Sequence, residues 1–113
     1  MELTRKCKML KIYVNENSRY KGHNLYHAVV LKLKEIGMAG VTVTRGLEGY
    51  GQKKAIHTAK ILDLSSSLTI IMEVVDIPEK IEKAIPIIEE MVNEGLMIVV
   101  DVDVIKYGDN KVD

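Results

Sequence analysis

Aromatic residues and cysteine are scarce in this chain of 113 residues. It has no phenylalanine and no tryptophan, and Cys7 is its only cysteine. Proteins that bind single-stranded RNA on a sheet stack the bases on aromatic side chains, so these absences argue against RNA recognition. A lone cysteine cannot form an intramolecular disulfide, which favours a reducing compartment.

Long apolar runs and net charge are also missing. No segment approaches the roughly 18–20 apolar residues that span a bilayer. The first residues, MELTRKCKMLK, lack the uninterrupted apolar stretch of a signal peptide. The 16 basic and 16 acidic side chains cancel, which does not favour a nucleic-acid-binding protein. We therefore expect a cytoplasmic protein without membrane insertion and without a nucleic-acid partner.

The composition is nevertheless that of a folded protein. Hydrophobic residues make up 47% of the chain, and its length corresponds to one domain, which we expect to comprise residues 1–113. Residues 1–60 carry twelve Lys or Arg and four Asp or Glu, whereas residues 61–113 carry four and twelve. If these charges lie on separate surfaces, they provide complementary patches for self-association.

Hydrophobic periodicity predicts the elements of the first half. Residues 8–14 alternate between two faces, which indicates a strand. Beginning at His23 or Asn24, apolar residues then recur at helical spacing as far as Ile36, and Gly37 supplies the C-terminal glycine of a helix. Residues 41–44 alternate again and predict a second strand.

The second half repeats this pattern. Residues 68–75 form a nearly continuous apolar run, which predicts a third strand. Asp76 and Glu79 have the spacing of a capping box and are followed by a helical stripe, so we expect a helix that begins at Asp76 and ends at Gly95. Residues 96–105 alternate and predict the last strand.

The order β-α-β-β-α-β predicts an α+β fold of the ferredoxin-like type, a four-stranded antiparallel sheet with both helices on one face. A long loop, about residues 46–66, would join the second and third strands, and the tail, residues 108–113, is expected to fray. The uncovered sheet face would carry apolar side chains, which suggests that a second subunit covers it: Met9, Tyr13 and Met97 or Val99.

Residues 40–51, GVTVTRGLEGYG, carry the clearest functional signal. The strand ends at Arg45, and Gly46, Gly49 and Gly51 follow within six residues. A glycine-rich turn lets backbone N–H groups approach an anion closely, and an arginine guanidinium can hold a phosphate with two hydrogen bonds. The same pattern also fits an ordinary hairpin loop that carries a solvated arginine.

Several segments, in this order, resemble the PII-like signalling proteins, and most closely a small PII-like family of unassigned function. The matching segments are LYHAVV at residues 25–30, the glycine-rich turn, His57, LDLS at residues 62–65 and IMEVVD at residues 71–76. In PII proteins a GMTVT strand and a GFG turn begin the long T-loop. Residues 41–44 and 49–51 stand in those places, and the resemblance covers most of residues 8–107.

The resemblance implies a homotrimer with the sheets facing inward and an adenine nucleotide in each cleft between subunits, at the base of the long loop. By position, the nucleotide-binding residues would be Arg45, Gly46, Gly49, Tyr50, Gly51, His57, Glu73 and Val75. PII proteins have a second glycine-rich, basic phosphate loop before the last strand, which here shrinks to residues 93–95 with one glycine and no cation. AMP or ADP is therefore a better expectation than ATP. The resemblance also implies a membrane transport or channel protein as a possible regulatory target.

Some of these residues have a simpler interpretation. Tyr50 fits stacking on a base and packing against a neighbouring subunit equally well. His57 fits a ligand contact or an ordinary loop position. Lys53 and Lys54 fit a solvated basic loop better than a phosphate site.

The alternative function is a trimeric divalent-metal-tolerance-type protein without nucleotide binding. His23 and His27 are spaced as a metal pair on a helix, but no third ligand accompanies them at motif spacing, so we expect no metal site. The sequence contains no Ser-His-Asp order, Walker sequence or HExxH motif. Acylphosphatases share the fold plan, but their arginine loop is absent from residues 15–22. We therefore expect a regulator without catalytic residues.

Overall fold

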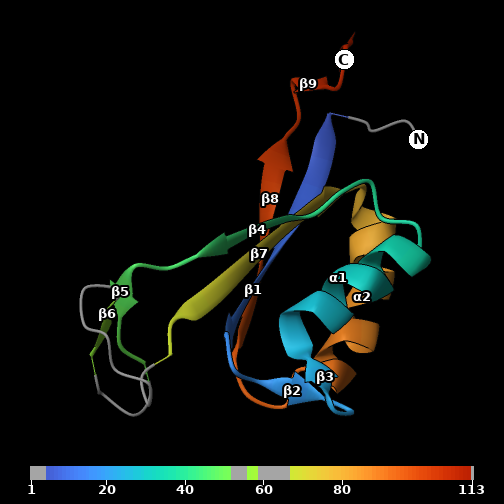
Figure 1. Ribbon diagram of the computed structural model, residues 1–113. Coiled ribbons are helices and arrows are strands. Elements are labelled where there is room, and N and C mark those ends of the chain that lie inside the picture. The colour runs from blue at the N-terminus through green and yellow to red at the C-terminus, as the bar shows by residue number, and fades with distance from the viewer. Residues whose placement is uncertain (1–4, 52–55, 59–66, 113) are drawn as a thin grey trace.

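A four-stranded antiparallel sheet forms the centre of the protein. The computed structural model describes residues 5–51, 56–58 and 67–112. The strands lie in the order β4 (Thr42–Arg45), β7 (Thr69–Asp76), β1 (Lys6–Asn15) and β8 (Leu96–Asp103), and each pairs antiparallel with its neighbour. The first and last strands of this sheet along the chain, β1 and β8, are therefore adjacent (Figure 1).

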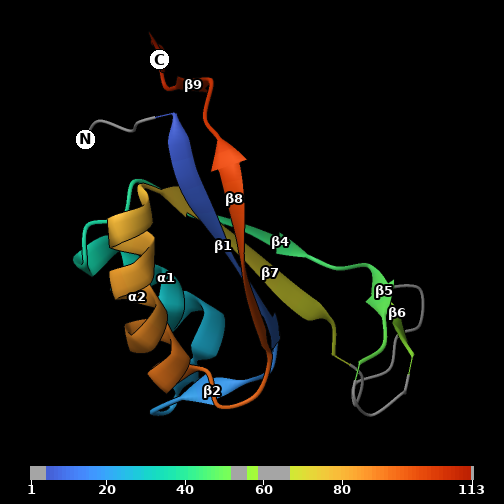
Figure 2. The same cartoon turned by 180° about the vertical axis from the view of Figure 1, so that it is seen from behind.

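Both helices, α1 (Leu25–Glu35) and α2 (Pro78–Met91), pack on the same face of this sheet (Figures 1 and 2). This confirms the predicted fold. Three short hairpins complete the described chain: β2 (Arg19–Tyr20) with β3 (His23–Asn24), β5 (Glu48–Gly49) with β6 (His57–Thr58), and β9 (Lys106–Tyr107) with β10 (Asn110–Lys111). The β5–β6 hairpin projects away from the helices.

The core lies between the sheet and the helices because alternate strand residues and one stripe of each helix are apolar. Removing one such side chain from water contributes about 1.5–3 kcal/mol. The core cluster consists of Leu10, Ile12, Val14, Leu25, Val29, Leu33, Ile70, Met72, Val74, Ile81, Ile88 and Met91.

The ends of α1 agree with the sequence pattern. The Asn24 side chain caps the N-terminus by accepting a hydrogen bond from the His27 N–H at 3.4 Å. Gly37 follows the last residues of the helix with φ at +82°, a conformation that favours glycine. The Lys80 ammonium donates to the Gly37 carbonyl at 3.1 Å, so α2 holds the C-terminal end of α1.

The predicted ends of α2 are wrong. The helix begins at Pro78 behind Ile77, which makes no side-chain capping bond, so Asp76 and Glu79 do not form a capping box. Asp76 is instead the last residue of β7, where the strand's alternation turns it inward and buries it completely. The helix ends at Met91, and Gly95 lies beyond it in the turn before β8.

The C-terminal segment also differs from expectation. The chain does not fray at Gly108: β9 and β10 pair across it, and the Val112 N–H donates to the Ile105 carbonyl at 2.8 Å. The Val112 side chain is buried. A hairpin of two-residue strands is too short to produce a periodic pattern in the sequence, which explains why it was missed.

The face of the sheet opposite the helices, here called the open face, carries Met9 and Tyr13, as predicted. Their partners on β8 are Val100 and Leu96, with Ile98 between them. Cross-strand partners lie on the same face, so Met97 and Val99, which pair with Ile12 and Leu10, lie on the helix side. The expectation that Met97 or Val99 belongs to the open face is therefore wrong.

Candidate functional site

The open face has a cavity at each of its two ends. The loop-base cavity, about 600 Å³, is enclosed by the end of β1, the glycine turn and the turn before β8. Its lining residues are Tyr13, Val14, Asn15, Ser18, Gly49, Tyr50, Gly51, Thr69, Glu94, Gly95 and Leu96.

The sheet-end cavity, about 860 Å³, lies at the opposite end of the same face. It is lined by Met9, Glu73, Val75, residues 39–42 and residues 102–107. The Tyr107 hydroxyl donates to the Ala39 carbonyl at 2.8 Å and links the segment after β8 to the connection between α1 and β4. One residue of β1 lines each cavity: Met9 the sheet-end cavity and Tyr13 the loop-base cavity. They are four residues apart, a distance of roughly 13 Å along a strand.

The predicted nucleotide-binding residues divide between these cavities. Gly49, Tyr50 and Gly51 line the loop-base cavity, whereas Glu73 and Val75 line the sheet-end cavity. The structure does not bring the two groups together within one subunit. Glu73 already has a partner on the open face, because the Lys11 ammonium lies 3.6 Å from its carboxylate.

Arg45 and Gly46 line neither cavity. Gly46 continues the pairing of β4 with β7, and its N–H donates to the Thr69 carbonyl at 2.8 Å, so this group is already engaged. His57 lies in β6 opposite Gly49. Lys53 and Lys54 lie outside the described residues.

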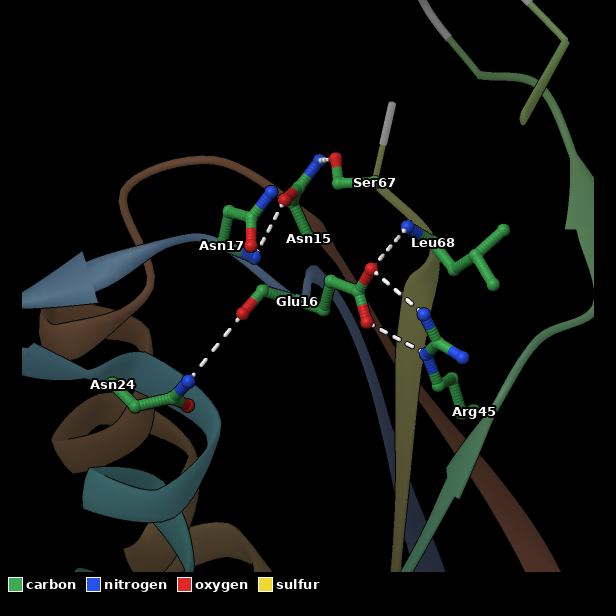
Figure 3. A network of polar contacts seen from close by, with 7 residues as sticks. All are labelled: Asn15, Glu16, Asn17, Asn24, Arg45, Ser67 and Leu68. Atoms are coloured by element: carbon green, nitrogen blue, oxygen red, sulfur yellow. Dashed lines mark hydrogen bonds and ion pairs between the residues drawn. The ribbon is translucent and has the colours of Figure 1, made fainter. Parts of the chain in front are cut away.

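Arg45 forms a two-pronged ion pair with Glu16, a residue that the sequence analysis did not single out (Figure 3). The Arg45 Nε lies 2.7 Å from Glu16 Oε2, and Nη2 lies 3.1 Å from Oε1. The Leu68 N–H donates to Oε1 as well, at 3.0 Å. The Arg45 side chain is 56% exposed and that of Glu16 20%. Nothing in the sequence pattern connects positions 16, 45 and 68, which only the strand register brings together.

The ion pair shifts the titration of both groups. The hydrogen bonds from Arg45, followed by the one from the Leu68 N–H, lower the pKa of the Glu16 carboxyl from its ordinary value of 4.5. The same carboxylate, through its hydrogen bonds first, raises the pKa of the Arg45 guanidinium. Both groups are therefore charged at neutral pH.

Backbone and side-chain hydrogen bonds attach the turn after β1, residues 15–17, to the start of β7. The Glu16 N–H donates to the Leu68 carbonyl at 2.9 Å, and the Asn15 amide donates to the Ser67 hydroxyl. The Asn15 side chain also accepts from the Asn17 N–H at 2.7 Å. Residues 15–17 consequently anchor Arg45, where the long loop begins, and residues 67–68, where it ends.

Within the described residues, we find neither a cluster of metal ligands nor a membrane-spanning helix. No group of three or more His, Cys, Asp or Glu side chains within them is arranged to hold a metal ion, and His23 and His27 are both exposed. No helix in the same ranges is long and apolar enough to cross a membrane.

A ferredoxin-like sheet with a glycine-rich turn after its second long strand is the arrangement that the PII-like resemblance predicts. The chain belongs to the DUF190 family, described as "Uncharacterized ACR, COG1993", whose family model matches residues 7–104. This is a PII-like family of unassigned function, which confirms the resemblance.

Two curated relatives are similar along most of their length. The chain is 38% identical over 102 residues to a UPF0166 protein of Methanocaldococcus jannaschii, covering 89% of this chain and 94% of the relative. It is 37% identical over 100 residues to a UPF0166 protein of Aquifex aeolicus, covering 88% and 94%.

Proposed function

We propose that the chain is a cytoplasmic, homotrimeric regulator, not an enzyme, that binds AMP or ADP in the clefts between its subunits. One observation carries this proposal: the residues predicted to contact the nucleotide are divided between two cavities at opposite ends of the open face. A single subunit cannot present both groups to one ligand. A neighbouring subunit can supply the second group.

A closed ring of subunits satisfies this requirement. In a head-to-tail interface, one patch of each subunit contacts a different patch of the next, and rotation closes the ring. The loop-base cavity of one subunit then faces the sheet-end cavity of its neighbour. The open face also provides an apolar surface to bury, because Leu96, Ile98 and Val100 are all exposed on β8.

The charges around the cavities favour a ligand with few phosphates. The loop-base cavity has no lysine or arginine among its described lining residues and contains the acidic Glu94. In the described lining of the sheet-end cavity, Lys106 is the only cation. Three closely spaced phosphates need more positive charge or more backbone donors than these residues offer. Tyr50, exposed at the loop base, can stack on the adenine ring.

The regulatory step would act through the long loop. A nucleotide in the loop-base cavity would contact residues 49–51, so its binding would change the surface that this part of the loop offers to a partner. A membrane transport or channel protein is the partner class that the PII-like resemblance suggests.

Calorimetric titration of the nucleotide-stripped protein tests the proposal directly. We expect micromolar binding of AMP or ADP at about one site per chain, weaker binding of ATP, and a trimer by sedimentation equilibrium. Titrations with and without magnesium would show whether the phosphates need a counterion. A folded protein that binds none of the three nucleotides would refute the nucleotide-sensing function.

A further inference from the structure

The carboxylate of Glu16 occupies a site built from hydrogen-bond donors. Arg45 directs Nε and Nη2 at its two oxygens, and the Leu68 N–H adds a third donor. An arginine fork combined with a backbone N–H is a set of groups that proteins also use to hold phosphate. The carboxylate thus has the charge and the acceptor atoms that a phosphate would bring.

We propose that Arg45 and Leu68 form an anion site that Glu16 fills in the absence of ligand, and that a phosphate group of the bound ligand exchanges with the Glu16 carboxylate. This inference rests on the proposed nucleotide function and adds a means of regulating the same site. Glu16 acts in it as an internal competitor.

The position of the site permits such an exchange. Asn15 and Thr69, the residues next to Glu16 and Leu68, line the loop-base cavity. Arg45 pairs with the core residue Ile70, so its guanidinium and the Leu68 N–H lie on the helix side of the sheet, at the same end as this cavity. Arg45 is more than half exposed, and therefore can reorient towards a ligand. The Glu16 backbone stays fixed by its bond to the Leu68 carbonyl when the side chain turns away.

The exchange would change how the two ends of the loop are held when a ligand binds. Arg45 is the last residue of β4, where the loop begins, and Leu68 directly precedes β7, where it ends. In the ligand-free protein Glu16 links both ends to the turn after β1. With a phosphate between them, the two ends would be joined by the ligand and no longer by Glu16.

The simpler alternative is that Glu16 has a purely structural role and stays bound to Arg45 and Leu68 whether or not a ligand is present. The two interpretations make opposite predictions for Glu16→Gln, which retains the size of the side chain but removes its charge. A competitor, once neutralised, leaves Arg45 available, so anions bind more tightly. If Glu16 is purely structural, the substitution weakens its bonds to Arg45 and Leu68 and loosens the loop base, so anions bind equally or less tightly.

The test is calorimetric titration with pyrophosphate, ADP and adenosine. Relative to the wild type, we expect Glu16→Gln to bind pyrophosphate and ADP about tenfold more tightly, because one charge-assisted contact no longer competes with the ligand. Adenosine, which has no phosphate, should bind unchanged. The gain should disappear in the double variant with Arg45→Ala. Glu48→Gln makes the same charge change on the exposed β5 strand and should alter affinity less than about twofold.

The outcomes separate this inference from the proposed function. If the wild type binds ADP and Glu16→Gln binds it equally or less tightly, the exchange is refuted and the nucleotide function stands. If no variant binds a nucleotide but Glu16→Gln gains pyrophosphate affinity, the nucleotide function fails and the anion site stands. If no variant binds pyrophosphate, the anion site is refuted. Glu16→Asp, whose shorter carboxylate retains the charge but cannot reach all three donors, provides a second variant should Glu16→Gln not fold.

Discussion

At the scale of single residues, the buried carboxylate of Asp76 holds together two segments that connect helices and strands. It accepts hydrogen bonds from the Ala39 and Ile77 N–H groups, each at 2.8 Å. These bonds join the connection between α1 and β4 to the start of α2. Since the side chain is fully buried, water cannot replace either partner if the carboxylate is lost.

We therefore expect Asp76→Asn to lower the free energy of unfolding by about 1–3 kcal/mol, because its amide NH₂ group would face one of the two backbone donors. Asp101→Asn is the matched control, since the Asp101 side chain is 86% exposed and pairs with Lys8, so its loss should change stability by less than about 1 kcal/mol. Urea denaturation of both variants measures the difference. Equal stabilities would show that the buried bonds of Asp76 contribute little.

Glu16 adds a dependence of stability on pH. Because Arg45 and the Leu68 N–H lower its pKa in the folded state, its ionised form stabilises the fold above the ordinary pKa of 4.5. This contribution is lost as the pH falls from that value through the lowered folded-state pKa.

Accordingly, we expect the difference in unfolding free energy between wild type and Glu16→Gln to be constant near neutral pH and to shrink below about pH 4.5. Denaturant titrations at a series of pH values, with Glu48→Gln as the control, measure it. A difference that persists unchanged into acid would mean that the charge of Glu16 does not stabilise the loop base.

Sequence reasoning reached only one side of the Glu16–Arg45 pair. Arg45 stood out because it ends a strand and precedes three glycines. Glu16 is 29 positions away in a polar segment without periodicity, and its proximity depends on how β1, β7 and β4 are aligned. Interactions of this kind are fixed by the tertiary register and leave no local signal.

At the scale of elements, the strands and helices followed from periodicity, and so did the ends of α1, but the ends of α2 did not. The Asp-x-x-Glu spacing at residues 76–79 fits a helix cap, yet Asp76 continues the inward alternation of β7. Asp76 belongs to the strand and not to the helix because β7 pairs with β1 as far as Asp76, which lies opposite Lys8. A cap motif directly after a strand is thus ambiguous until the register is known.

Gly95 illustrates an element junction that requires glycine for reasons other than ending a helix. A Cβ atom there would lie 2.5 Å from the Tyr13 carbonyl oxygen, on the backbone of the central strand β1. Neither backbone can move without disturbing the pairing of β1 with β8. The close approach holds the turn that begins β8 against the loop-base cavity, which Gly95 also lines.

Replacing Gly95 with alanine should therefore reduce the free energy of unfolding by about 1–3 kcal/mol, through overpacking and because the φ angle of +156° is one that L side chains rarely adopt. Gly49→Ala is the matched control, because nothing lies within 4 Å of an added Cβ and the φ angle is ordinary. Thermal and urea denaturation of the two variants give the comparison. If Gly95→Ala is as stable as Gly49→Ala, the turn is able to shift and the tight contact is not a constraint.

At the scale of the whole molecule, part of the uneven charge along the sequence is paired within the subunit. The basic first half supplies β1, which lies between β7 and β8 from the acidic second half. Three pairs bridge these strands: Lys6 with Asp103, Lys8 with Asp101, and Lys11 with Glu73. The interleaved fold thus pairs, within one subunit, part of the charge that the sequence alone could have assigned to self-association. We therefore expect apolar contact on the open face to be the more important driving force for the proposed assembly.

The proposed site links assembly to ligand binding, and this link is the most general prediction. Ile98 lies in the middle of β8 on the open face, 39% exposed in the subunit. An aspartate there costs little in a monomer, where it faces water and the neighbouring Lys11, but it would bury a charge in the proposed interface. Ile98→Asp should therefore yield folded monomers by sedimentation equilibrium, together with at least about tenfold weaker ADP binding by calorimetry.

Leu31→Asp is the matched control, since Leu31 is 53% exposed on the helix side of the molecule, away from the open face. This variant should remain trimeric and bind ADP like the wild type. Weakened binding in Ile98→Asp alone would mean that each nucleotide needs two subunits, because only assembly unites residues 49–51 of one subunit with Glu73 and Val75 of the next. Monomers that bind ADP at full affinity would instead place the whole site within one chain and remove the reason for the interface.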